Sequence, residues 1–202
     1  LAALKEGIIT ENTKIRVNRR TYMTVTKAIA VSNNRFFATL GRRLKFARIR
    51  EYAMRWGFGQ KAGWKIKGED PGTFPDQPPR RGVGYLSSHG AGIKATALQM
   101  AAFVSALANG GKLYYLQYPR TTEEILNFYP RLKRKLMISK YLPKIKDAME
   151  ATVLYGTGSI AYDYDHTIYG KTGTCSEKKI RLGWFISHAN SQNPKYVVIV
   201  LL

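Results

Sequence analysis

Cysteine and histidine are scarce in this sequence. Cys175 is the only cysteine, and the three histidines, His89, His166 and His188, are far apart along the chain. A single cysteine excludes a disulfide within the chain, and these residues have no spacing typical of a zinc or thiolate-cluster site. We therefore expect no metal and no cofactor. We expect Cys175 to be buried for packing rather than to act as a reactive thiol, and we expect the histidines to be structural.

Acidic residues are also few. Asp and Glu number 13 against 33 Lys and Arg, which gives a formal net charge of +20. Such a surface attracts polyanions, among them nucleic acid, anionic lipid headgroups and acidic polymers. The sequence contains no stacking motif, zinc-finger spacing or recognition helix of the known nucleic-acid binders, so we expect no nucleic-acid partner. We interpret the charge instead as suited to anionic lipid or an acidic polymer.

Long hydrophobic runs are missing as well. Stretches such as "LQMAAFVSALA" at 98–108 are too short to span a bilayer, and no basic-then-apolar leader opens the chain. The first residues, "LAALKEG", are typical of a helix end that closes at Gly7. The last residues, "KYVVIVLL", are typical of the middle of a strand. We therefore expect a chain cut from a longer protein.

The hydrophobic periodicity changes along the chain. Residues 14–56 are expected to be mostly helical, with one helix ending at Gly41 and the next at Gly57, and 57–93 to be irregular. Helices are then predicted after Thr96, to Ala108, and over 142–153. Three strands follow at 167–174, 181–188 and 195–202, the last two joined by the turn "NSQNP". Helices followed by hairpin-connected strands predict an α+β fold with an antiparallel sheet.

Two short motifs carry the chemistry. "KTGT" (Lys171–Thr174) is predicted to open the first strand of that sheet, and "SNN" (Ser32–Asn34) to form a turn between helices. Together with Ser-x-x-Lys, such motifs characterise penicillin-binding proteins and serine β-lactamases. The only Ser-x-x-Lys here is "SEKK" (Ser176–Lys179). We expect it in a loop and interpret it as a chance match, because the nucleophile of this chemistry is held at a helix N-terminus.

The chain resembles class B penicillin-binding proteins, the peptidoglycan D,D-transpeptidases, over nearly its whole length. The segments that carry the resemblance are, in order, "AVSNNRFFATLG", "YAMRWGFGQKAG", "GEDPGTFP", "GAGIKATALQMAAFVSALANGG", "YGTGSIA" and "YGKTGTC". Ala91 and Ala97 depart from the family's usual Gln and Pro. The resemblance implies a partial transpeptidase domain over 1–202, a helical subdomain packed on an antiparallel sheet. Its mainly helical part, 1–153, carries the Ser-x-Asn motif, and 154–202 carries the sheet strands.

The resemblance also implies a role for each motif residue. Lys171 supplies a cation that attracts the substrate carboxylate, Ser32 relays a proton to the leaving amine, and Asn34 bonds a substrate amide and the motif lysine. A solvated strand lysine and a simple helix cap are the alternatives for "KTGT" and "SNN". Strict alternation sends Lys171 and Thr172 to opposite faces. Both side chains can serve one cleft only if the strand lies at the edge of the sheet and the substrate runs along it, so we expect an edge strand.

On that edge strand, the substrate-binding residues are Thr172, Gly173 and Thr174. The threonines offer hydroxyls to the carboxylate, and Gly173 lets an extended peptide pair with the strand edge. The backbone N–H of Thr174 would be one oxyanion donor. The nucleophilic serine is expected upstream of residue 1, so we expect the chain by itself to be inactive.

The activity implied is cross-linking of stem peptides through a serine acyl-enzyme that β-lactams also acylate. Three alternatives remain open: a β-lactamase, a β-lactam sensor and a non-catalytic module that binds cell-wall peptide. The resemblance further implies a membrane glycosyltransferase partner. It also implies an upstream membrane anchor that holds the domain at the outer face of the cytoplasmic membrane.

Overall fold

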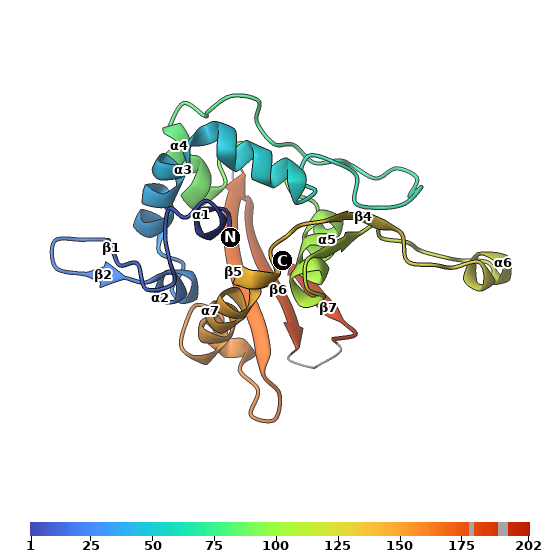
Figure 1. The fold of residues 1–202 in the computed structure, drawn as a ribbon. Helices are drawn as coiled ribbons and strands as arrows, with labels where there is room; N and C mark the ends of the chain where they lie inside the picture. The colour runs from blue at the N-terminus through green and yellow to red at the C-terminus, as the bar shows by residue number, and fades with distance from the viewer. Residues whose placement is uncertain (178–179, 190–193) are drawn as a thin grey trace.

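The computed structural model describes residues 1–177, 180–189 and 194–202. Its centre is a three-stranded antiparallel sheet of β5 (Ile168–Glu177), β6 (Ile180–Ala189) and β7 (Val197–Leu201), in the order β5-β6-β7. Helix α7 (Leu142–Leu154) packs on β5, and α5 (Ala97–Ala108) packs on β6 and β7 (Figure 1). The predicted α+β class with an antiparallel sheet is confirmed.

The helical part of the chain precedes this sheet. It contains α1 (Ala2–Lys5), α2 (Val25–Ala30), α3 (Asn34–Arg55) and α4 (Gly82–His89). One continuous core joins α1, α2, α3, α5, α7 and β5, and its fully buried members include Ala28, Phe36 and Ala106. Burying a side chain as large as Phe36 stabilises the fold by roughly 1.5–3 kcal/mol. This shared core fixes the helices against the strand that carries the Lys-Thr-Gly-Thr motif.

Local signals explain several of the boundaries. Helix α5 begins after Thr96, whose side chain accepts from the backbone of Gln99 while the Gln99 side chain accepts from the backbone N–H of Thr96. This reciprocal capping box satisfies two amide groups that a helix start leaves free. Helix α1 ends before Gly7, which has φ 67°, as the sequence predicted.

The prediction that Gly41 ends a helix is wrong. The helical backbone continues through Gly41 and is interrupted at Lys45 (φ 65°, ψ 160°), where a kink joins two helical segments within α3, so the two predicted helices are present but their boundary lies at Lys45. Gly41 lies against α4, where an added Cβ would overlap the Ser87 hydroxyl and approach the Val83 carbonyl oxygen to 3.0 Å. The glycine is therefore explained by the close approach of two helices rather than by a helix end.

Two further predictions from composition are wrong. Residues 14–24 do not continue the helical region: β1 (Ile15–Arg16) and β2 (Tyr22–Met23) form a small antiparallel hairpin there. The region 57–93 is not wholly irregular, because α4 lies within it. The glycines and serines of α4 conceal it in the sequence, since they are poor helix formers that packing on α3 compensates.

A projecting arm connects α5 to α7. It contains β3 (Lys112–Tyr114), α6 (Thr122–Leu126) and β4 (Leu132–Lys135), with β3 and β4 paired antiparallel. Figure 1 shows α6 at the far end of this arm. The short 3-10 helices η1 (Ser139–Tyr141) and η2 (Ser159–Ala161) flank α7.

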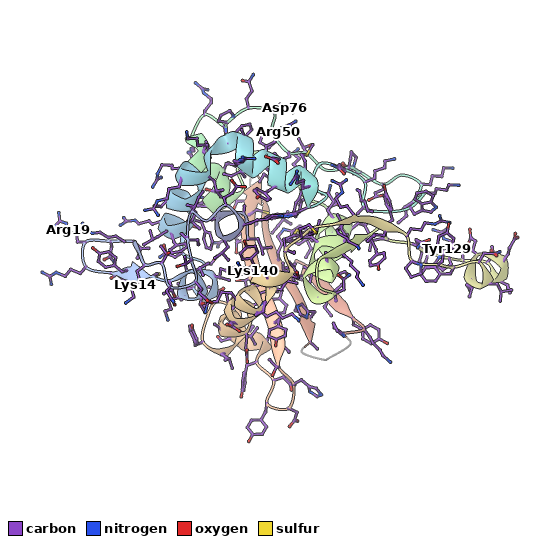
Figure 2. The ribbon with its side chains drawn as sticks, viewed as in Figure 1. Lys14, Arg19, Arg50, Asp76, Tyr129 and Lys140 are labelled. Atoms are coloured by element: carbon purple, nitrogen blue, oxygen red, sulfur yellow. The ribbon has the colours of Figure 1, made fainter. Side chains whose placement is uncertain are left out.

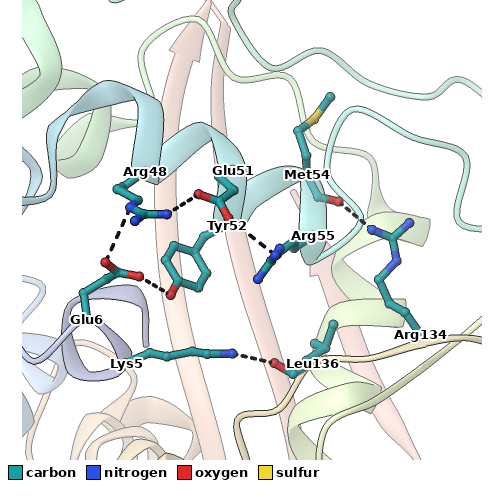
Figure 3. Close-up of polar contacts among 9 residues, drawn as sticks. All are labelled: Lys5, Glu6, Arg48, Glu51, Tyr52, Met54, Arg55, Arg134 and Leu136. Atoms are coloured by element: carbon teal, nitrogen blue, oxygen red, sulfur yellow. Dashed lines mark hydrogen bonds and ion pairs between the residues drawn. The ribbon is translucent and has the colours of Figure 1, made fainter.

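Polar contacts hold the first helix to the middle of α3 (Figure 3). The Tyr52 hydroxyl donates to Glu6 Oε1 at 2.6 Å, and Arg48 Nε lies 3.5 Å from Glu6 Oε2. Lys5 Nζ donates to the Leu136 carbonyl at 3.2 Å. Burial, followed by the Glu6 hydrogen bond, raises the pKa of Tyr52 to about 12. Residues 1–7 are thereby fixed beside α3 and the end of the arm.

The positive charge is spread over the molecule. Figure 2 labels Lys14 and Arg19 at the β1–β2 hairpin, Arg50 on α3 and Lys140 in η1, which are three separate parts of the fold. No helix in the described part of the chain combines the length and apolarity needed to cross a bilayer.

Candidate active site

The Lys-Thr-Gly-Thr motif lies inside β5 and does not open it. The strand begins at Ile168, and Lys171, Thr172 and Gly173 pair with Ile186, Phe185 and Trp184 of β6. Among the strands that the structure describes, β5 pairs only with β6. One edge of the motif strand is therefore available for an added strand within the described residues.

The Ser-Asn-Asn turn joins α2 to α3. Asn33 is the N-cap of α3, because its side chain accepts from the Phe36 N–H at 2.9 Å. The capping alternative thus applies to Asn33, and the side chains of Ser32 and Asn34 are left for other contacts. Ser32 has φ 51°, a left-handed conformation that costs a non-glycine residue roughly 1–3 kcal/mol. Such strain is typical of residues whose position serves a site.

Lys171 and Ser32 meet across 139 residues of sequence. Lys171 Nζ donates to Ser32 Oγ at 3.0 Å and to the carbonyl oxygen of Thr172 at 2.7 Å. Burial lowers the pKa of the Lys171 ammonium to about 8. With that pKa, about a tenth of the molecules carry a neutral amine at pH 7. The contact can therefore stabilise an anion and also exchange a proton with the Ser32 hydroxyl.

Thr172 points to a different partner, as strand alternation requires. Its hydroxyl is hydrogen-bonded to the hydroxyl of Thr157, whose backbone N–H donates to the Ala30 carbonyl at 2.9 Å. Each hydroxyl has one proton, and the shared bond uses one of the two. Thr157 Oγ1 also donates to the Ala30 carbonyl at 3.5 Å, so the Thr172 hydroxyl donates to Thr157, and a ligand gains a proton only by replacing that long contact. We did not predict Thr157 as a site residue, and the Gly-Thr-Gly stretch at 156–158 was the available signal.

Gly173 and Thr174 complete the motif. An added Cβ at Gly173 would lie 3.4 Å from the Trp184 Cβ, an ordinary packing distance, so the sheet itself does not require glycine there. At Gly170 the situation is the reverse, because an added Cβ would lie 2.7 Å from Phe185 Cζ and 2.9 Å from Val153 Cγ2. Thr174 is exposed. The strand is thus tightly packed before the motif and open along it.

His89 lies beside the turn, a position that no pattern in the sequence predicts. Its Nε2 is 3.3 Å from the Asn34 Nδ2, and its ring stacks on Tyr85 with centroids 4.3 Å apart. Helix α4, which the composition of 57–93 did not predict, ends at His89 and places this residue beside Asn34. His89 thus contacts a motif residue, and the structural role expected of it stays a prediction.

Two expectations about the end of β5 are also corrected. Cys175 is exposed rather than buried. Ser176 lies in β5 and not in a loop, while residues 178–179 of "SEKK" are outside the described residues. In the described part of the chain, no group of three His, Cys, Asp or Glu residues is placed to hold a metal ion.

Comparison with known proteins agrees with this architecture. The family model described as penicillin binding protein transpeptidase domain matches residues 1–202. The transpeptidase domain of Burkholderia pseudomallei penicillin-binding protein 3 superposes with a TM-score of 0.85 at 20% identity, covering 100% of this chain and 67% of that one. The fold is therefore that of a penicillin-binding transpeptidase domain.

Sequence relatives lead to the same family. Stage V sporulation protein D of Bacillus subtilis is 31% identical over 191 residues, which cover 88% of this chain and 30% of the relative. Peptidoglycan D,D-transpeptidase MrdA of Acinetobacter baumannii is 25% identical over 206 residues, covering 87% of this chain and 31% of the relative. The chain spans about a third of the length of these relatives. It belongs to the transpeptidase domain family of penicillin-binding proteins, in class B.

Proposed function

We propose that this domain forms the substrate cleft of a peptidoglycan D,D-transpeptidase that works through a serine acyl-enzyme. The observation that carries the proposal is the contact of 3.0 Å between Lys171 Nζ and Ser32 Oγ, beside a strand edge that is open in the described residues. A half-buried cation, a hydroxyl that can relay a proton and an edge for peptide pairing are what acyl transfer to and from a peptide requires.

The reaction proceeds in two balanced steps. In the first, a serine oxygen attacks the carbonyl carbon of a D-Ala-D-Ala bond, the C–N bond breaks, and the proton of the serine reaches the departing amine through Ser32. In the second, the amine of another stem peptide attacks the ester carbonyl carbon, a C–N bond forms as the C–O bond to the serine breaks, and the proton lost by the amine returns to the serine oxygen. We place the attacking serine on a segment outside these 202 residues, because Ser176 lies in a strand.

The other motif residues bind the substrate. Lys171 and the hydroxyls of the Thr157–Thr172 pair hold the terminal carboxylate, and the edge of β5 at Gly173 pairs with the peptide backbone. The N–H of Thr174 stabilises the oxyanion. Asn34 contacts the substrate amide. β-Lactams would occupy the same positions, and the structure of Mycobacterium penicillin-binding protein 3 with ampicillin is a relative of the same fold, at a TM-score of 0.78.

The test is to treat the full-length protein with a labelled penicillin, digest it, and locate the adduct by mass spectrometry. We expect a stable adduct on a serine outside this chain that precedes Gly7. An adduct on Ser176 would overturn the assignment of the nucleophile. No adduct on folded protein would favour a module that only binds cell-wall peptide, and rapid loss of the adduct would favour a β-lactamase. Slow loss without cross-linking activity would favour a sensor.

We further propose that the domain acts at the outer face of the cytoplasmic membrane, beside a membrane glycosyltransferase that supplies the glycan strands. The support is the family membership and the net charge of +20, which suits anionic lipid and wall polymer. Labelling by a membrane-impermeant reagent in intact cells tests the location, and co-purification of a glycosyltransferase tests the partner. Equal binding of the domain to neutral and anionic vesicles would contradict the role given to the charge.

A further inference from the structure

We infer that His89 is a positioning residue that fixes the side-chain amide of Asn34 in one of its two orientations. This inference rests on the proposed function, because Asn34 matters to catalysis only if the cleft binds substrate. The two residues are 55 positions apart, and the end of α4 brings His89 Nε2 to 3.3 Å from Asn34 Nδ2. An asparagine amide donates through its nitrogen and accepts through its oxygen, so its orientation decides which of the two faces the cleft.

The tautomer of His89 follows from its other neighbour. The Ser88 hydroxyl donates its single proton to the Gly84 carbonyl at 2.8 Å. Ser88 Oγ also lies 2.7 Å from His89 Nδ1, and with its proton used it can only accept there. With the Ser88 proton directed to Gly84, we assign the His89 proton to Nδ1 and a lone pair to Nε2. That lone pair accepts a hydrogen bond from the Asn34 amide nitrogen.

The consequence for Asn34 is a fixed polarity. Its amide nitrogen is bound to His89, and its Oδ1 has no hydrogen-bond partner among the described residues. The oxygen is thus left to accept from a substrate N–H or from an ammonium group. If the amide turned over, its NH2 group would face those donors and the contact would become repulsive. His89 is therefore expected to favour the amide orientation that the reaction uses.

The ring of His89 is itself held in place. It stacks on Tyr85 one helical turn earlier, with an interplanar angle of 21°. Arg81 in turn donates to the Tyr85 hydroxyl at 2.8 Å and lies over its ring. These contacts limit the motion of an otherwise exposed side chain, so the acceptor stays where the amide needs it.

The kinetic test measures the rate of acylation of the full-length protein by a fluorescent penicillin. We expect His89→Leu to lower it about three- to tenfold, the usual effect of one hydrogen bond. We expect His89→Gln to recover most of the loss, since its amide oxygen can replace Nε2 as the acceptor. In an Asn34→Ala background, His89→Leu should have no further effect. His166→Leu, which removes a histidine from a remote loop, is the matched control with unchanged acylation.

A second measurement does not depend on acylation. Nitrogen NMR shifts should show the His89 proton on Nδ1, and the side-chain NH2 signals of Asn34 should move in His89→Leu. A proton on Nε2, or equal acylation rates in wild type and His89→Leu, would overturn the inference. If His89→Leu lowers the acylation rate by the same factor in wild type and in the Asn34→Ala background, His89 acts independently of the Asn34 amide, and the inference is likewise overturned. Absence of any adduct in the wild type would count against the proposed function, while the NMR result still decides the role of His89.

Discussion

Gly170 and Gly173 provide a matched pair of substitutions on one strand. At Gly170 a methyl group would lie 2.7 Å from Phe185 Cζ and 2.9 Å from Val153 Cγ2, which is closer than packed carbon atoms tolerate. Overpacking of this kind costs roughly 1–3 kcal/mol. At Gly173 the closest atom would be the Trp184 Cβ at 3.4 Å, so no clash arises. The gain from replacing a strand glycine is about 0.5–1 kcal/mol. Gly170→Ala should therefore destabilise the domain and Gly173→Ala should not.

The functional consequences should be opposite. The methyl group of Gly173→Ala would project from the face of the sheet that Lys171 shares, directly beside the edge where we propose that the peptide pairs, so acylation by a labelled penicillin should fall at least about tenfold. Gly170→Ala should acylate at a nearly normal rate whenever it is folded. Urea unfolding monitored by tryptophan fluorescence gives the stabilities, and gel fluorescence gives the acylation rates. Loss of stability in Gly173→Ala equal to that in Gly170→Ala, with acylation unchanged, would refute the open-edge reasoning.

Three further predictions concern side chains around the cleft and the first helix. The pKa of Lys171 is about 8 in the folded protein against 10.5 for an ordinary lysine. Its charge therefore destabilises the fold below pH 8, and this destabilisation is lost as the pH rises toward 10. Over that pH window the unfolding free energy of wild type should rise by about 1–2 kcal/mol relative to that of Lys171→Met. Tyr52→Phe should lower the unfolding free energy in urea by about 1 kcal/mol at pH 7, since Glu6 loses a hydrogen bond. Thr157→Val should leave the melting temperature nearly unchanged but slow acylation about threefold or more, because it removes a hydroxyl from the Thr157–Thr172 pair.

The sequence predicts best the features that rest on local chemistry. The change from helical to strand periodicity correctly predicts the sheet that follows residue 154, and Thr96, a residue type that favours helix caps, correctly predicts the start of α5. The glycine after α1 likewise predicts a helix end. Each of these signals acts within a few residues and needs no partner elsewhere in the chain.

The features that the sequence does not predict depend on distant contacts. Gly41 has the composition of a helix end, but its reason is the packing of α4, which follows it by some forty residues and is itself rich in glycine and serine. The contact of His89 with Asn34 depends on that same helix. Because α4 is stabilised by packing rather than by propensity, local patterns miss both the helix and the residue that it delivers to the cleft.

Ser32 allows the strain at the cleft to be separated from its chemistry. Its φ of 51° disfavours any residue with a Cβ, and its Oγ accepts from Lys171 at 3.0 Å. Ser32→Ala and Ser32→Gly both remove that hydrogen bond, but only glycine adopts the left-handed conformation without cost. Glycine also has greater freedom in the unfolded chain, which offsets about 0.5–1 kcal/mol of the gain. We therefore expect Ser32→Gly to exceed Ser32→Ala in unfolding free energy by about 1 kcal/mol, with acylation slowed similarly in both. If Ser32→Ala and Ser32→Gly have equal unfolding free energies in urea, the turn relaxes in both variants, and the hydrogen bond from Lys171 alone holds Ser32 in the wild type.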